Sequence, residues 1–144
     1  MYEVRTCRYG DEDLLMEFLL SLPTEALNHW HPCGPVFNLE DFAKLFQQSL
    51  DLKVICLDNG KIVSFGHLTE CDEGISLGIV SLEKRKGYGC QVMKKLLNIA
   101  RHLDYFQIVL TVHKDNEEAI KFFTEWDFVI DGDCSAEEYH MVRN

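Results

Sequence analysis

The segment from Ile75 to Val112 constrains the fold most, because a strand, a glycine loop, an amphipathic helix and a second strand follow one another in it. Apolar residues recur at helical spacing between residues 89 and 103: Met93, Leu96, Leu97, Ala100 and Leu103. Residues 106–112 are almost wholly apolar, which is typical of a short buried strand. This order predicts a strand–loop–helix–strand crossover.

The segment before this crossover predicts a strand and two helices. Residues 2–9 alternate well enough for a strand, and Asp11 is placed to cap a helix that ends near Pro23. The apolar stripe of this helix consists of Leu14, Leu15, Phe18, Leu19 and Leu22. Asn38 is placed to cap a second helix through Leu50. Residues 24–37 between them contain two prolines and a glycine, so we expect a loop or a broken helix.

A three-strand antiparallel meander is predicted next. Residues 53–58 and 61–69 read as strands joined by Asn59-Gly60, because both residues tolerate the positive φ of a two-residue hairpin turn. A second turn at Asp72-Glu73-Gly74 leads into a strand over residues 75–80.

The carboxyl-terminal part predicts one helix and two strands. Asn116 is placed to cap the helix, and the strands at 128–130 and 137–142 are separated by Asp131-Gly132-Asp133. The complete order predicts an α/β (α+β) fold, in which a mixed, mostly antiparallel central sheet carries helices on both faces. We expect residues 1–144 to form a single domain.

Composition narrows the expected partners and compartment. The formal net charge of −10 disfavours binding to nucleic acid or to an anionic membrane, and it favours cationic partners such as amines. No apolar run approaches the roughly 20 residues that span a bilayer, and the amino terminus does not resemble a signal sequence. Six scattered cysteines without a CxxC pair indicate structural thiols in a reducing compartment. We therefore expect a soluble, cytoplasmic protein.

The loop of residues 84–90 has the composition of an anion site. Residues 84–95 hold five of the 14 basic residues and no Asp or Glu; the five are Lys84, Arg85, Lys86, Lys94 and Lys95. Gly87 and Gly89 lie where a strand passes into a helix, so backbone N–H groups and the helix dipole can face a phosphate. A basic turn whose glycines serve geometry alone is the alternative. Val92 breaks a dinucleotide GxGxxG pattern, and the chain has no GxxxxGK[ST] phosphate loop.

Two segments resemble motifs of the GNAT N-acetyltransferases. The run Val80-Ser81-Leu82-Glu83-Lys84-Arg85-Lys86-Gly87-Tyr88-Gly89-Cys90 is similar to the family's acetyl-CoA motif, [QR]-x-x-G-x-[GA] after a strand. The run Asn116-Glu117-Glu118-Ala119-Ile120-Lys121-Phe122-Phe123-Thr124-Glu125-Trp126-Asp127-Phe128 resembles N-x-x-A-x-x-[FL]-Y-x-x-x-G-F. Their order and separation, together with the element order from Tyr2 to Arg143, imply the GNAT acyl-CoA N-acyltransferase fold.

The resemblance implies acetyl-CoA as co-substrate, with its pyrophosphate on the glycine loop and its pantetheine arm beside the backbone of Ile79 and Val80. The implied cofactor-binding residues are Ile79, Val80, Lys84, Arg85, Lys86, Gly87, Tyr88, Gly89, Cys90, Asn116 and Phe123. Lys84 departs from the motif's Gln or Arg but keeps a cation. Asp127 replaces a glycine, and aspartate tolerates the left-handed conformation.

The resemblance further implies direct attack of an amine on the thioester, with no acylated protein nucleophile. Phe123 stands where many members have a tyrosine that protonates the departing thiolate. Here another group or water would protonate the thiolate, or the thiolate would leave without an acid. The candidate bases are Glu70 and His67, followed by Glu73 in the next turn, and the candidate acid is His113. Each has a structural alternative as a packed or solvated residue.

The acceptor is expected to enter past the first two helices, where the candidate residues are His29, Trp30, His31 and Phe37. The spacing of His29, His31 and Cys33 also permits a metal site, but neighbouring prolines favour a shaped loop, and we expect no metal. The resemblance leaves a homodimer open.

Three functions compete at this point. The first is an acetyl-CoA-dependent N-acetyltransferase acting on a small amine, an amino sugar or a peptide amine. A catalytically weak CoA-binding regulatory domain would explain Phe123. A phosphate-binding module without CoA would explain the basic loop but not the segment from Asn116 to Phe128.

Overall fold

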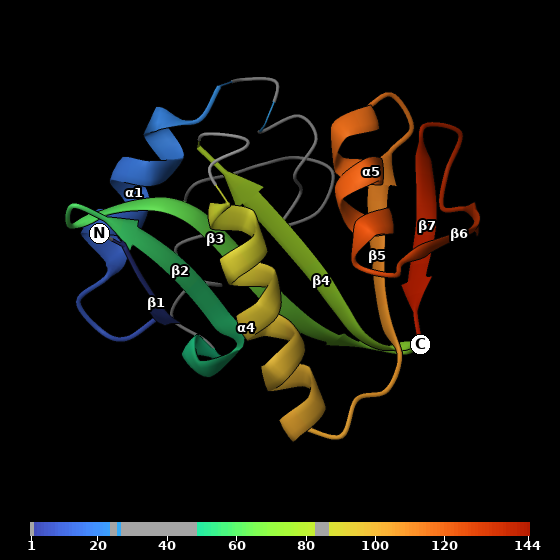
Figure 1. The fold of residues 1–144 in the computed structure, drawn as a ribbon, viewed down its shortest axis with the longest axis horizontal. Helices are drawn as coiled ribbons and strands as arrows, with labels where there is room; N and C mark the ends of the chain where they lie inside the picture. The colour runs from blue at the N-terminus through green and yellow to red at the C-terminus, as the bar shows by residue number, and fades with distance from the viewer. Residues whose placement is uncertain (1, 24–25, 27–48, 83–86) are drawn as a thin grey trace. The chain divides into compact units, whose positions relative to one another are not determined.

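A computed structural model of the chain describes residues 2–23, 26, 49–82 and 87–144. The elements in these ranges are β1 (Tyr2–Thr6), α1 (Glu12–Ser21), the 3₁₀ helix η1 (Leu50–Leu52), β2 (Lys53–Asp58), β3 (Lys61–Cys71), β4 (Gly74–Ser81), α4 (Tyr88–His102), β5 (Ile108–His113), α5 (Glu117–Glu125), β6 (Val129–Asp133) and β7 (Glu138–Arg143). The described strands pair in the order β1-β2-β3-β4-β5-β7-β6, with β4 and β5 parallel (Figure 1). This mixed sheet confirms the predicted fold class.

The chain divides into two compact units. The first contains Met1–Leu68 and Gly78–Ile99, and the second contains Thr69–Leu77 and Ala100–Asn144. The predicted helix between residues 38 and 50 lies almost wholly outside the described residues. No helix in the described part of the chain is long and apolar enough to cross a membrane.

The first unit is built on the antiparallel strands β1, β2 and β3. The predicted Asn59-Gly60 turn is confirmed, since both residues have positive φ values, 53° and 79°. Strand β2 is buried along nearly its whole length, and its apolar side chains join those of α1 in one core. That core contains Leu15, Phe18, Leu19, Leu22, Ile55, Leu57 and Phe65.

Helix α4 packs closely on β3 in this unit, because Gly66 has no side chain. A β-carbon added at Gly66 would lie 2.6 Å from Val92 Cγ1 and 2.7 Å from Leu96 Cδ1. Val92 and Leu96 are both fully buried, as is Met93 between them. Of the apolar stripe predicted for this helix, Met93, Leu96 and Ala100 are buried and Leu97 is half-buried. Leu103 was wrongly included, because α4 ends at His102 and Leu103 is exposed.

The start of α1 differs from the prediction. Asp11 occupies the N-cap position, but its side chain makes no cap hydrogen bond to the helix. Its carboxylate instead accepts hydrogen bonds from the Arg5 guanidinium at 2.8 and 2.9 Å and from the Arg8 backbone N–H at 2.9 Å. The Asp11 carboxylate therefore bonds to the Arg5 guanidinium, six residues earlier, in place of the N–H groups of the first turn of α1.

The second unit pairs β5 with β7 and β7 with β6, both antiparallel. Asn116 caps α5 as predicted, its side-chain oxygen accepting the Ala119 N–H at 3.3 Å. Asp127 has a φ of 70°, the left-handed conformation expected for it.

The end of the chain corrects one prediction. Asp131-Gly132-Asp133 belongs to β6 instead of separating the two strands. The pairing register with β7 shifts between Ile130 and Asp133, and Gly132 has a φ of 84° within that shift. Gly132 therefore lies in a β-bulge of β6, and the chain turns only after Asp133.

Candidate functional site

The described end of the glycine loop has the geometry of an anion site. Gly87 has a φ of 79°, and a β-carbon added there would meet no described atom within 4 Å. Helix α4 begins at Tyr88, and its first helical hydrogen bond runs from the Gln91 N–H to the Gly87 carbonyl. The N–H groups of residues 88–90 precede that bond, and the described first turn carries no acidic residue. These groups fit a phosphate.

The other predicted residues of the loop divide into two groups. Lys84, Arg85 and Lys86 lie outside the described residues. Cys90 is exposed in the first turn of α4. Gly89 lies beside it in the same turn.

The Tyr88 side chain turns into the first unit. Its ring is buried and lies edge-on to that of Tyr2, with the ring centroids 6.4 Å apart. Its hydroxyl donates a hydrogen bond to Asp58 Oδ2 at 2.6 Å. The Tyr88 side chain therefore joins the start of α4 to the end of β2.

The predicted pantetheine strand is the end of β4. Ile79 is half-buried and Val80 is buried. The Val80 carbonyl accepts a hydrogen bond from the Ser64 hydroxyl at 3.2 Å, and the hydroxyls of Ser64 and Ser81 lie 2.8 Å apart. Sequence reasoning did not identify Ser64, although a serine amid apolar residues of a buried strand is a usable signal.

His67, a candidate base, is half-buried in the first unit. Its Nε2 is buried, and a β-carbon added at Gly78 would lie only 2.5 Å from that atom. Burial, and secondarily the positive charge of Lys53, lowers the pKa of His67 to about 4. The imidazole is therefore neutral at pH 7 and is a weak base.

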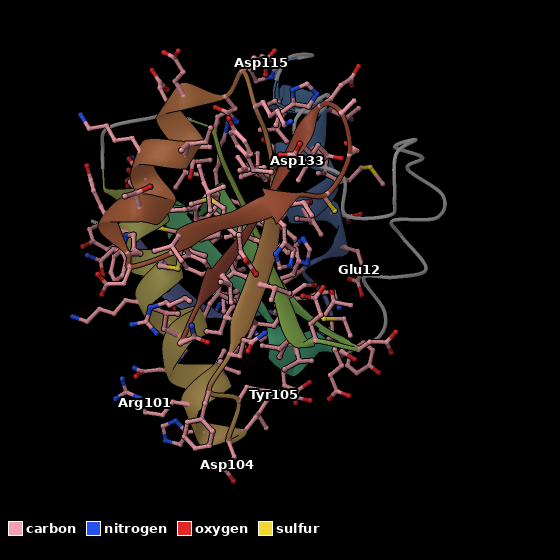
Figure 2. All side chains as sticks on the ribbon, turned by 90° about the vertical axis from the view of Figure 1, so that its right-hand side faces the viewer. Glu12, Arg101, Asp104, Tyr105, Asp115 and Asp133 are labelled. Carbon is pink, nitrogen blue, oxygen red and sulfur yellow. The ribbon has the colours of Figure 1, made fainter. Side chains whose placement is uncertain are left out.

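Glu70, the other candidate base, is exposed in the second unit. Partial burial, and secondarily the Glu70 carboxylate, raises the pKa of the Tyr105 hydroxyl. Tyr105 lies just before β5, and Figure 2 shows it at one end of this unit.

His113, the candidate acid, lies at the last residue of β5 with 23% of its side chain exposed. Its Nδ1 lies 2.8 Å from Asp115 Oδ1, and its Nε2 lies 3.8 Å from Glu137 Oε2. Asp115 is at the opposite end of the unit from Tyr105 (Figure 2). Within this unit the structure therefore does not bring Glu70 and His113 together.

A second histidine between carboxylates escaped the sequence reasoning. His140 on β7 pairs with Thr111 of β5, and its Nε2 lies 2.9 Å from Glu73 Oε2. Its Nδ1 lies 3.8 Å from Asp131 Oδ2. Glu73 is 67 residues from His140 in the sequence, and no spacing along the chain indicates this contact.

Phe123 and Asn116 occupy α5. The Phe123 ring is buried, with its centroid 5.4 Å from that of Phe122 and 5.7 Å from that of Phe128. It thus packs as an apolar residue, while Asn116 serves as the helix cap. Two predictions fall outside the described residues. They are the acceptor candidates His29, Trp30, His31 and Phe37, and the alternative metal site at His29, His31 and Cys33.

Comparison with known proteins gives one consistent result. Residues 16–128 match the model of the "Acetyltransferase (GNAT) family". No curated protein matches the chain in sequence.

Solved structures resemble the chain over nearly its whole length. The GNAT domain of S. lividans PAT superposes with a TM-score of 0.84 at 13% identity, covering 98% of this chain and 89% of that one. The PaiA N-acetyltransferase of Thermoplasma acidophilum, solved with coenzyme A, has a TM-score of 0.71, 15% identity and coverages of 100% and 99%. YncA of Salmonella typhimurium, a putative acetyltransferase solved with acetyl-CoA, has a TM-score of 0.78, 12% identity and coverages of 98% and 92%.

Proposed function

Because the chain belongs to the GNAT acetyltransferase family, whose members use acetyl-CoA as co-substrate, we propose that it acetylates an amine of a small molecule, an amino sugar or a peptide. The start of α4 is the observation that carries the proposal. A β-carbon added at Gly87 would meet no described atom within 4 Å, the N–H groups of residues 88–90 belong to the first turn of α4, and no acidic side chain occurs in that described turn. A pyrophosphate finds directional donors there.

Acetyl-CoA supplies the acetyl group as a thioester. The neutral acceptor amine attacks the carbonyl carbon, so a C–N bond forms, the C–S bond breaks and coenzyme A leaves as a thiolate. The amine gives up one proton in this step, and the thiolate takes up one proton or leaves unprotonated. The chain need supply no nucleophile.

The three candidate proton-transfer groups differ in their surroundings. His67 is a poor acceptor of the amine proton, because its pKa is about 4. Glu70 is exposed and able to accept it, either directly or through water. His113 is partly exposed, and Asp115 and Glu137 would both lie within 4 Å of an imidazolium formed there. Because Glu70 and His113 do not lie together, we assign proton transfer to only one of these two residues, ahead of His67.

The first test is binding. The melting temperature is measured with acetyl-CoA, coenzyme A and ATP, and we expect stabilisation by the first two. Stabilisation by ATP alone would contradict the proposal and favour a general phosphate-binding module. Thiol release is then followed across a panel of small amines, amino sugars and amino-terminal peptides. One of the two variants Glu70→Gln and His113→Asn should lower turnover at saturating acetyl-CoA without changing its affinity, and the other should leave turnover unchanged.

A catalytically weak CoA-binding domain is the second candidate. It is favoured by Phe123, whose ring is packed between two other phenylalanines and has no proton to donate. Binding of acetyl-CoA without thiol release on any amine of the panel is the outcome that would support it.

A further inference from the structure

We infer that two side-chain contacts, Tyr88 to Asp58 and Ser64 to Ser81, position the backbone that receives the co-substrate. Each contact joins one part of that backbone to the hairpin of β2 and β3. The inference rests on the proposed function, since it concerns how the same site is held. None of the four side chains needs to touch the ligand, so they are positioning residues.

The first contact fixes the start of α4. Tyr88 is the first residue of the helix, and the residue is only 8% exposed. Its hydroxyl reaches Asp58, the last residue of β2, at 2.6 Å, a short distance typical of a hydrogen bond to a carboxylate. Because the Tyr88 ring is buried and its hydroxyl is hydrogen-bonded, the first turn of α4 can neither rotate about the helix axis nor move away from β2 without breaking these contacts. The N–H groups of residues 88–90 share that turn.

The second contact fixes the end of β4. Ser64 on β3 is completely buried, and a buried hydroxyl without a hydrogen bond would cost about 1–3 kcal/mol. Its hydroxyl donates to the Val80 carbonyl, which leaves its oxygen to accept a hydrogen bond from the Ser81 hydroxyl at 2.8 Å. Two successive residues of β4 are thereby held by one side chain. The backbone hydrogen bond from Leu82 N–H to the Val63 carbonyl continues the same attachment.

The two contacts act on backbone whose hydrogen bonds are directional. A phosphate bound by N–H groups loses affinity when the donors turn away from it, because hydrogen bonds weaken steeply with angle. Gly66 brings α4 against β3, with a β-carbon position 2.6 Å from Val92, so apolar packing sets the distance of the helix. The Tyr88 hydroxyl adds the orientation of its first turn.

The test compares affinity with stability. Coenzyme A is titrated calorimetrically into the wild-type protein and into Tyr88→Phe, Ser64→Ala, Ser81→Ala and Asp58→Ala, and the melting temperature of each unliganded variant is measured. Tyr88→Phe keeps the ring and removes only the hydroxyl, and we expect its Kd for coenzyme A to rise on the order of tenfold. The double variant Tyr88→Phe/Asp58→Ala should bind no worse than either single variant, because both remove the same contact.

Asp11→Asn is the matched control. This substitution weakens the ion pair between Arg5 and Asp11 in the same unit. It should lower the melting temperature and leave the Kd for coenzyme A unchanged. Asp58→Asn retains an acceptor oxygen and should recover part of the affinity lost in Asp58→Ala. An unchanged Kd in Tyr88→Phe and Ser64→Ala, with coenzyme A still bound by the wild type, would overturn this inference alone. Failure of the wild type to bind coenzyme A would overturn the proposed function, and the inference with it.

Discussion

His67 lies so close to the backbone of Gly78 that a β-carbon at residue 78 would stand 2.5 Å from Nε2 and 2.9 Å from Cε1. His67 and Phe65 both lie on β3, with their ring centroids 5.9 Å apart, and Gly78 lies on the neighbouring strand β4. The glycine therefore provides the space that the histidine ring occupies.

This relationship predicts that Gly78→Ala destabilises the protein by about 1–3 kcal/mol, the usual cost of overpacking. The free energy of unfolding from urea denaturation measures it. The double variant Gly78→Ala/His67→Ala is the control, because removing the ring should make the alanine at residue 78 nearly neutral. Additive losses in the double variant would show that the ring is not what the methyl group meets.

The lowered pKa of His67 also predicts a pH dependence of stability. Its folded pKa of about 4 lies below the ordinary histidine value of about 6.5, so the unfolded chain binds the extra proton between these pH values. Stability should fall on the order of 3 kcal/mol as the pH drops from about 6.5 to about 4. In His67→Gln this part of the loss should disappear from denaturation curves recorded at successive pH values. An equal slope in both proteins would contradict the assignment.

The sequence predicts some of these features well and others not at all. The Asn59-Gly60 turn, the Asn116 cap and the left-handed Asp127 are local, since each depends on the conformational range of one or two residues. Periodicity likewise places α4, whose buried stripe follows directly from its spacing. Local chemistry and spacing therefore account for most of the described elements.

Long-range charge and packing explain where sequence reasoning was wrong or silent. Asp11 is a residue type favoured at a helix N-cap, yet its carboxylate is hydrogen-bonded to the Arg5 guanidinium. His140 meets Glu73 only through the pairing of β7 with β5, and Ser64 meets Ser81 across β3 and β4. No spacing along the chain marks such contacts, because they are set by strand register.

The pair of Arg5 and Asp11 predicts a second, more acidic transition. Hydrogen bonds from Arg5 hold the pKa of the Asp11 carboxyl below its usual value of about 3.9. The pair therefore stabilises the folded protein above about pH 3.9, and this stabilisation is lost as the pH falls through the folded pKa. At pH 7, Asp11→Asn should cost about 3 kcal/mol, because it leaves a largely buried guanidinium without its carboxylate. The difference from wild type should shrink below pH 3.9. A constant difference down to pH 2 would mean that charge plays no part.

Phe123→Tyr tests whether an absent acid limits the reaction. If protonation of the departing thiolate is slow, the new hydroxyl should raise turnover at saturating substrates, typically by 10²-fold or less. The hydroxyl enters an aromatic cluster with Phe122 and Phe128, so the melting temperature must be measured alongside. Phe122→Tyr on the same helix is the control and should leave turnover unchanged. Equal turnover in wild type and Phe123→Tyr would show that the acid step is supplied elsewhere or is fast.

Gly87 and Gly60 offer a matched pair for testing the anion site. Both have a φ of 79°, and an added β-carbon would meet no described atom within 4 Å of either. Each alanine variant should therefore lose about 1–2 kcal/mol of stability from the left-handed backbone alone. Only Gly87 lies beside the N–H groups that begin α4, so only Gly87→Ala should raise the Kd for coenzyme A, by roughly tenfold or more, since the new methyl group points into space that a phosphate would fill. Isothermal titration of both variants at equal ionic strength separates strain from binding. Equal affinity in the two variants would remove the start of α4 from the binding site, whatever their stabilities.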